Sequence, residues 1–178
     1  MNLEEFHKSI ADCSKCALSF SRTQVVPGSG NPDANIMFIG EAPGKNEDLK
    51  GEPFIGAAGK FLNEMLEGIG LKREDIFIAN TIKCRPPDNR DPLQEEIDTC
   101  FPYLKKQILF IKPKIIVSLG RFSLNLFFPE AKIGKVHGQI LQKDSLQVLA
   151  LYHPAAALYN GGMRETLQKD FQILKKFI

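Results

Sequence analysis

Four short apolar runs, separated by segments with helical periodicity, constrain the fold of this 178-residue chain more than any other feature. Continuous apolar runs of this length are typical of strands that are buried on both faces of a sheet. The runs cover residues 35–39, 76–79, 114–119 and 147–151. The helical segments cover residues 59–69, 92–111, 122–128 and 165–177. Strands that alternate with helices predict an α/β fold, with a short parallel sheet of about four strands covered by helices on both faces.

The helical segment at 92–111 carries its own boundary signals. Asp91 is expected to be its N-cap and Pro92 its first residue, because proline is tolerated where the backbone N–H has no helical partner. Pro102 lies inside the same segment. We therefore expect this helix to be kinked or to restart at Pro102.

Length and composition predict a single domain over residues 1–178. Hydrophobic residues make up 43% and charged residues 25%, which are ordinary globular values. No repeat or Pro/Gly/Ser-rich linker divides the chain. The N-terminus lacks the apolar run of a secretory signal, and no run is long enough to span a membrane. We expect a cytoplasmic monomer with no membrane partner.

The four cysteines form a C-x2-C pair, Cys13 and Cys16, and a wider pair, Cys84 and Cys100. Structural disulfides are rare in cytosolic proteins, so this arrangement favours a shared metal ion or cluster. Four buried free thiols are the alternative. Zinc and iron–sulfur clusters both accept four cysteines, and the spacing does not choose between them.

Polar side chains follow three of the four expected strands. They are Glu41, in the Gly-Pro loop after the first strand, Asn80 after the second, and His153 after the fourth. Ligands of open parallel sheets bind beyond the carboxyl ends of the strands, so these residues predict a site there. Pro154 favours an extended backbone at His153 and directs the ring away from the sheet. Ordinary turn residues are the alternative for Glu41 and Asn80, and a histidine satisfied within its loop is the alternative for His153.

Two further segments have features of a binding surface. Phe54 lies in a loop rich in glycine and proline, where an aromatic ring is free to stack on a planar ligand. Residues 83–90 form a rigid, locally basic segment containing Arg85 and Arg90, which predicts phosphate contacts. The net charge of +2 does not by itself imply nucleic acid, and a solvated charged face is the alternative.

These pieces together resemble a known family. The motifs GEAPG (40–44), GEPFIGAAG (51–59), NTIKCRPPDNRDP (80–92) and HPAAAL (153–158) occur in the order seen in family 4 uracil-DNA glycosylases, the iron–sulfur branch of the uracil glycosylase superfamily. The resemblance covers nearly the whole chain. It implies a three-layer α/β/α sandwich and a structural [4Fe–4S] cluster on Cys13, Cys16, Cys84 and Cys100.

The resemblance also implies roles in removing uracil from DNA. Phe54 would stack on the flipped base, and Asn80 would pair with its polar edge and disfavour cytosine. His153 and the backbone amides around Ala42 would stabilise charge on uracil O2 as the glycosidic bond breaks. Ala42 stands where the best-known branch has an aspartate, so the usual general base is missing. Glu41 ranks ahead of Glu47 for orienting the water, and capture of water by the oxocarbenium-like intermediate with little help is the alternative. Glu47 is alternatively placed to exclude thymine.

Contacts to the DNA are implied by the same resemblance. Ala157 and Leu158 would enter the minor groove and fill the space left by the base. Arg85, Arg90 and Arg164 would contact phosphates of single- or double-stranded DNA, and the protein would be associated with the nucleoid when it is on DNA. Two other functions stay open from the sequence: a non-catalytic DNA-binding module stabilised by a metal or cluster, and a redox protein in which a cluster carries electrons.

Overall fold

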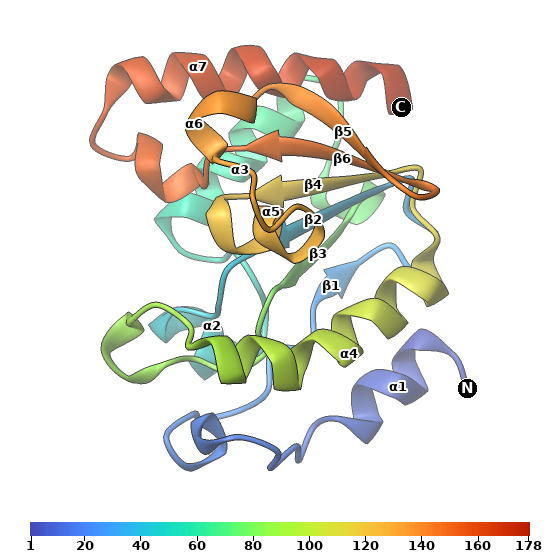
Figure 1. Cartoon of the computed structure of the whole chain (residues 1–178), viewed down its shortest axis with the longest axis vertical. Coiled ribbons are helices and arrows are strands. Elements are labelled where there is room, and N and C mark those ends of the chain that lie inside the picture. The colour runs from blue at the N-terminus through green and yellow to red at the C-terminus, as the bar shows by residue number, and fades with distance from the viewer.

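The computed structural model describes residues 1–178 and contains a six-stranded sheet with the order β1-β3-β2-β4-β6-β5. The four central strands, β3, β2, β4 and β6, are parallel, and β1 and β5 are antiparallel edge strands. The arrows of the central strands point to the same side in Figure 1. The strands are β1 Ser29–Gly30, β2 Ile36–Gly40, β3 Phe77–Asn80, β4 Ile115–Leu119, β5 Gln139–Lys143 and β6 Leu146–Leu151.

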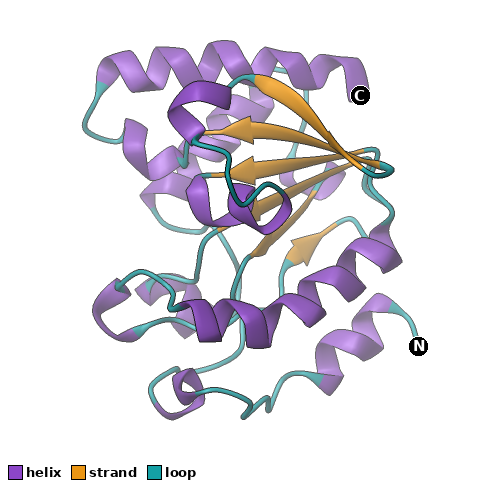
Figure 2. Ribbon diagram, in the orientation of Figure 1, coloured by secondary structure: helices purple, strands orange, loops and turns teal.

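Helices cover both faces of this sheet, and Figure 2 shows the layers by secondary structure. The α-helices are α1 Leu3–Ser9, α2 Lys45–Lys50, α3 Ala57–Glu67, α4 Gln94–Ile111, α5 Arg121–Phe127, α6 Ile133–Val136 and α7 Gly161–Phe171. Short 3-10 turns occupy Ala17–Phe20, Arg73–Asp75, Pro87–Asn89, Pro154–Ala157 and Gln172–Phe177. The arrangement is the expected three-layer α/β/α fold. No helix is long and apolar enough to cross a membrane.

Alternate side chains of the central strands divide the core between the two faces. On one face, Phe38 and Val117 pack with α3 and α7, where Phe38 stacks on Phe171 at 5.7 Å between ring centroids. On the other face, Met37 and Ile116 pack with α4 and α5. Because strand residues point alternately to the two faces, a strand covered on both sides is apolar throughout, which explains the continuous runs in the sequence.

A third apolar cluster joins the N-terminal segment to the rest of the molecule. Phe6 of α1 and Ile10, directly after α1, pack with Leu18, with Ile97 of α4 and with Cys84. In Figure 1, α1 lies beside α4 on the side away from the sheet. Asn2 caps α1 by accepting a hydrogen bond from the Glu5 N–H, while the Glu5 carboxylate accepts from the Asn2 N–H.

The structure confirms the four parallel strands and adds elements that the sequence patterns did not reveal. The two edge strands were missed because β1 has two residues and β5 is half-exposed and polar at its ends. The short helices α1, α2 and α6 were missed as well.

The start of α4 was predicted two residues too early. The helix begins at Gln94, where the Glu96 carboxylate accepts the Leu93 N–H, and Asp91 instead pairs with Arg121. Nor does α4 restart at Pro102, because it is one helix from Gln94 to Ile111.

Candidate functional site

A cavity of about 410 Å³ lies at the carboxyl ends of the parallel strands. This volume is within the range of small-ligand pockets. Its wall combines the loop after β2, the first turn of α2, the basic loop before α4 and the turn after β6. The lining residues are Glu41, Ala42, Pro43, Gly44, Glu47, Pro86, Asn89, Arg90, His153 and Ala155. Four residues predicted from the sequence for one site, Glu41, Ala42, Glu47 and His153, therefore share this cavity.

His153 is held in the form of a neutral hydrogen-bond donor. Its Nδ1 accepts a hydrogen bond of 3.1 Å from the backbone N–H of Ala155. A neutral imidazole whose Nδ1 accepts carries its proton on Nε2. Burial lowers the pKa of His153 to about 4, which keeps the ring neutral at physiological pH.

Phe54 lies directly behind His153, and the two rings stack with 5.4 Å between centroids and 26° between planes. Phe54 has a positive φ of 52° and is 6% exposed. Gly40, at the end of β2, has no side chain and so leaves room for the Phe54 ring. A Cβ there would lie 2.5 Å from both the Phe54 ring and Asn80 Oδ1. Gly40, Phe54 and Asn80 therefore form one close-packed group.

Asn80 is the last residue of β3 and is 2% exposed. Its Oδ1 is buried and has no hydrogen-bond partner, as is the case for one other side-chain atom, Gln107 Oε1. A buried acceptor without a donor costs about 1–3 kcal/mol, so such atoms are rare away from binding sites. Neither Asn80 nor Phe54 is among the lining residues of the cavity, but Phe54 stacks on His153, which is one of them.

The two carboxylates of the cavity differ in their surroundings. Burial raises the pKa of Glu41, Asp91 raises it further, and Arg121 opposes both effects. Glu47 lies on α2 above the glycine loop, where a Cβ on Gly44 would be 2.8 Å from its Oε2. The Glu41 carboxyl therefore binds a proton more strongly than an ordinary glutamate carboxyl, which suits a group that accepts one.

Of the three arginines predicted to contact phosphates, Arg90 and Arg164 already have anionic partners. Arg90 binds both carboxylate oxygens of the buried Glu96, at 3.0 and 2.7 Å. Arg164 pairs with Glu64, and its guanidinium lies 4.2 Å from the centroid of the Phe61 ring. Arg85 donates through Nε to Asn89 Oδ1 at 2.7 Å and is the arginine of this set without a carboxylate partner.

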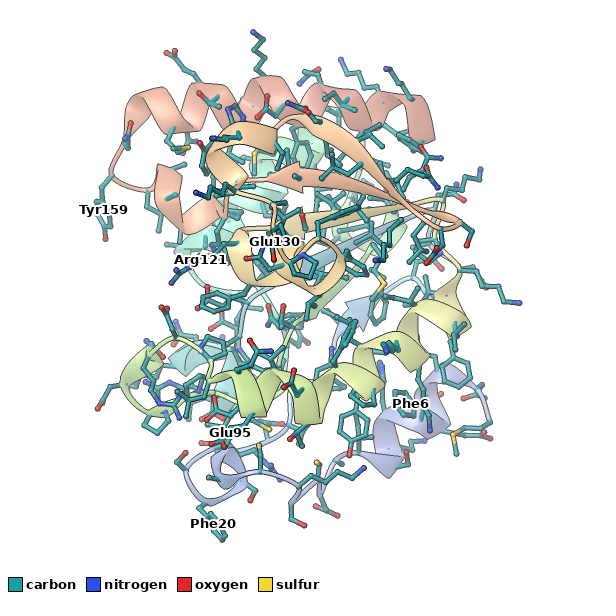
Figure 3. The ribbon with its side chains drawn as sticks, viewed as in Figure 1. Phe6, Phe20, Glu95, Arg121, Glu130 and Tyr159 are labelled. Atoms are coloured by element: carbon teal, nitrogen blue, oxygen red, sulfur yellow. The ribbon has the colours of Figure 1, made fainter.

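The turn after His153 exposes a different residue from the two that the sequence indicated. Ala157 is 3% exposed and belongs to the core, so it does not reach outward in this conformation. Leu158 is half-buried. Tyr159 is 98% exposed and projects away from the loop before α7 (Figure 3). The sequence signal that could have identified Tyr159 is an aromatic residue directly before a polar, glycine-rich stretch, Asn160 to Gly162.

The four cysteines line a second, small enclosed cavity on the far side of the basic loop. Arg22, Val25, Lys83, Thr99 and Tyr103 complete its wall. Arg22 donates to Cys84 Sγ at 3.4 Å, and the Tyr103 hydroxyl lies 3.2 Å from Cys13 Sγ. Burial raises the pKa of Cys84 to about 11. No three His, Cys, Asp or Glu side chains in the chain are grouped so as to hold one metal ion.

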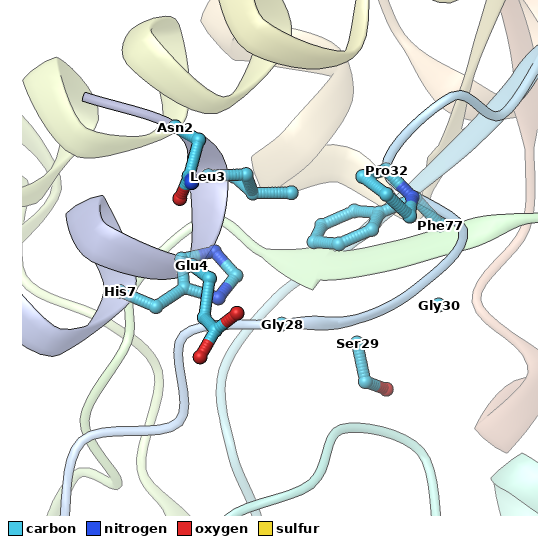
Figure 4. Close-up of a pocket in the computed structure, with 9 residues that line it drawn as sticks. All are labelled: Asn2, Leu3, Glu4, His7, Gly28, Ser29, Gly30, Pro32 and Phe77. Carbon is cyan, nitrogen blue, oxygen red and sulfur yellow. The ribbon is translucent and has the colours of Figure 1, made fainter.

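A further cavity, of about 460 Å³, lies at the opposite edge of the sheet (Figure 4). Its wall includes Phe77, the first residue of β3, together with His7 and Glu4 of α1. His7 is already hydrogen-bonded to Gln107 Nε2 at 2.9 Å. Because ligands of parallel sheets bind at the carboxyl ends of the strands, this cavity at an amino end is the weaker candidate.

The fold and the cavity together define an α/β protein with a small-ligand site at the carboxyl edge of its sheet. The sequence model of the Uracil DNA glycosylase superfamily matches residues 27–176, and the chain belongs to that superfamily. It is 49% identical to a type-4 uracil-DNA glycosylase of Archaeoglobus fulgidus, over 96% of this chain and 90% of that protein. It is 48% identical to that of Sulfurisphaera tokodaii, over 98% and 84%, and 39% identical to that of Thermotoga maritima, over 99% and 94%.

Proposed function

We propose that this protein is a DNA-repair enzyme that flips uracil out of DNA and hydrolyses its N-glycosidic bond, leaving an abasic site. One observation carries the proposal: the buried Asn80 Oδ1 without a partner, packed beside Phe54 and the neutral donor His153. The relatives named type-4 uracil-DNA glycosylases support it over nearly the full length of the chain.

Asn80 has the two groups needed to recognise uracil. Its Oδ1 would accept the N3–H of the base, and its amide nitrogen would donate to O4. Cytosine offers an acceptor at N3 and a donor at position 4, so both contacts would be mismatched. A site that leaves a buried polar group unpaired with the wrong base discriminates strongly.

The base has to leave the DNA stack before its glycosidic bond is accessible. Phe54 stacks on His153 of the cavity wall, so an entering uracil has to part this stack and take the place of the imidazole against Phe54. The His153 ring would then lie at the edge of the base and would no longer stack on Phe54.

Bond cleavage places negative charge on the departing uracil. The bond from C1′ to N1 breaks, and its electron pair stays on the base, shared between N1 and O2. The Nε2–H of His153 and the backbone amides beside Ala42 would donate to O2, and preorganised donors of this kind supply about 3–4 kcal/mol each. His153 acts as a neutral donor, so the proton stays on the ring.

Water completes the reaction at C1′. Glu41 would orient the water and accept its proton as the C–O bond forms, and the uracil anion would later take a proton from solvent. Glu47, on the other side of the glycine loop, would border the C5 position of the base and exclude the methyl group of thymine.

Contacts to DNA are assigned to Arg85 and to the turn after His153. Arg85 would contact a backbone phosphate, and Leu158 with Tyr159 would fill the gap left by the flipped base. Arg90 and Arg164 would act mainly by holding the protein surface in shape, because each is engaged by a carboxylate.

Cys13, Cys16, Cys84 and Cys100 would hold a [4Fe–4S] cluster. Their four thiols surround one enclosed cavity with two cations, Arg22 and Lys83, in its wall, and this donor set fits an anionic cluster in which each iron takes one thiolate. When bound, the cluster supplies a structural cross-link between the N-terminal segment and α4, with no electron transfer in the reaction. The packing of α1 on α4 supports a single domain over residues 1–178, which we propose to be monomeric and cytoplasmic.

Alkali-developed cleavage of uracil-containing oligonucleotides tests the activity, with a thymine duplex as control. Uracil-specific cleavage by the wild-type protein and a loss of about 100-fold or more in His153→Ala are expected. His137→Ala is the matched control, because His137 pairs with Asp170 elsewhere in the fold. Binding of the oligonucleotide by the iron-loaded protein without base release would contradict the enzyme and favour a DNA-binding module.

A further inference from the structure

Lys83 is buried with no acidic partner. It is 1% exposed, and none of the ion pairs of the chain includes it. Its Nζ donates one hydrogen bond, of 2.9 Å, to the backbone carbonyl of Asn80. An ammonium group removed from water is costly unless an anion compensates for it.

The surroundings of Lys83 show where such an anion would be. The side chain lines the same small cavity as the four cysteines, and Cys84 is its direct neighbour in the chain. A four-iron cluster held by four thiolates carries net negative charge. The chain therefore places a cation between the cysteine centre and the residue that would read uracil.

We propose that Lys83 is a positioning residue that pairs electrostatically with the cluster and, through its bond to the Asn80 carbonyl, holds the uracil-reading amide in place. This inference rests on the cluster and the activity proposed above. It assigns Lys83 a role in joining the two sites, so that loading the cluster and binding the base favour each other.

Arg22 is the other cation in the wall of the cysteine cavity. It donates a hydrogen bond to Cys84 Sγ at 3.4 Å. Arg22 thus supplies a cation to the cluster without touching Asn80, which makes it a matched comparison for Lys83.

The first measurements concern the cluster itself. Lys83→Met, Arg22→Met and the exposed control Lys176→Met are purified without oxygen and compared with wild type for iron and sulfide content, loss of iron to a chelator, and midpoint potential. Removing either cation near the cluster is expected to lower the potential and to speed iron loss by about 10-fold, whereas Lys176→Met behaves as wild type. A purely structural lysine would leave the potential unchanged.

The second measurement concerns the base. Calorimetric titration with free uracil is expected to show about 10-fold weaker binding for Lys83→Met, because the Asn80 carbonyl loses its donor, and unchanged binding for Arg22→Met. Should Lys83→Met fail to fold, Lys83→Gln, which is neutral but keeps a polar end, takes its place with the same expectations.

The outcomes separate this inference from the proposed function. Wild-type potential and uracil affinity in the Lys83 variant would overturn the inference and leave the enzyme intact. A lowered potential with unchanged uracil affinity would overturn the link to Asn80. Wild-type protein without iron and sulfide would contradict the cluster and with it the pairing, while iron-loaded protein that does not release uracil would contradict the activity alone.

Discussion

The imidazole of His153 accepts a hydrogen bond at Nδ1 from the backbone N–H of Ala155, two residues along the chain. Pro154 between them fixes the backbone of this turn and brings that N–H within hydrogen-bond distance of Nδ1. The turn therefore determines the tautomer of the side chain, and the proton on Nε2 is left for a ligand.

The state of His153 gives a prediction that requires no substrate. Nitrogen NMR of the imidazole is expected to show the Nε2–H tautomer at pH 7 and protonation only as the pH approaches about 4, because burial disfavours the cation. The unfolded chain takes up this proton near pH 6.5, so stability is expected to fall as the pH drops from 6.5 toward 4. A ring that titrates at its ordinary value, or one that carries its proton on Nδ1, would contradict the proposed donor.

Glu41 gives a prediction for the acid limb of the reaction. Its carboxyl has to be ionised to orient water, so base release is expected to decline as the pH falls through a pKa above the ordinary 4.5. Burial is the largest cause of this raised pKa, and the charge of Asp91 raises it further. Arg121, which forms an ion pair with Asp91, lowers the pKa of Glu41. Asp91→Asn should therefore move the acid limb of kcat to lower pH, and Arg121→Gln should move it to higher pH. Identical pH profiles for the two variants would assign the limb to another group.

Substitution of Asn80 is expected to reduce activity far more than it reduces stability. Asn80→Ala removes the buried oxygen that has no partner, and this gain offsets part of the lost packing. We expect the free energy of unfolding to change by about 1 kcal/mol or less, while uracil release falls by about 100-fold or more. Urea unfolding and single-turnover kinetics measure the two effects. A large loss of stability with little loss of activity would assign Asn80 a structural role.

The sequence predicts the central sheet because a strand covered on both faces has to be apolar along its whole length. The edge strands escape this argument. Gln139 and Lys143 at the ends of β5 are exposed, and β1 pairs through only Ser29 and Gly30. The order of the strands depends on pairing between distant segments, which one sequence does not encode locally.

The functional site, like the sheet, could be predicted from the sequence only in part. Glu41, Asn80 and His153 could be found because they follow strands, and parallel strands bring their carboxyl ends to one edge. The stacking of Phe54 on His153, the Lys83 contact with Asn80 and the Glu96 partner of Arg90 depend on side-chain packing across the fold, so no sequence spacing reveals them. The core position of Ala157 likewise follows from how its turn settles against α3 and α7.

Alanine substitutions of Arg90 and Arg85 are expected to have different effects, the first on stability and the second on DNA binding. Arg90→Ala leaves the buried Glu96 carboxylate without its partner and should lower the stability of the protein. The Glu96 pKa is lowered chiefly by its hydrogen bonds to Arg90, so this contribution is present above pH 4.5 and is lost as the pH falls below it.

Arg85→Ala should leave stability within about 0.5 kcal/mol but reduce the salt dependence of DNA binding by about one phosphate contact. Thermal unfolding and binding titrations over a range of salt concentrations check both variants. A lower salt dependence in Arg90→Ala, with stability preserved, would return Arg90 to the phosphate-binding set.

Tyr159 gives the prediction that distinguishes double- from single-stranded substrates. Its ring is 98% exposed and makes no packing contribution, so Tyr159→Ala should unfold at the wild-type temperature. If the ring fills the gap left by a flipped base, its loss should slow uracil release from a duplex by about 10-fold or more, since unstacking a base step costs a few kcal/mol. Release from a single strand, where no paired stack has to be opened, should change less. Tyr159→Phe is the matched variant and should retain the duplex activity, because stacking needs the ring and not the hydroxyl. Equal losses on both substrates would instead place Tyr159 in general DNA binding, and no loss on either would leave Leu158 as the residue that enters the gap.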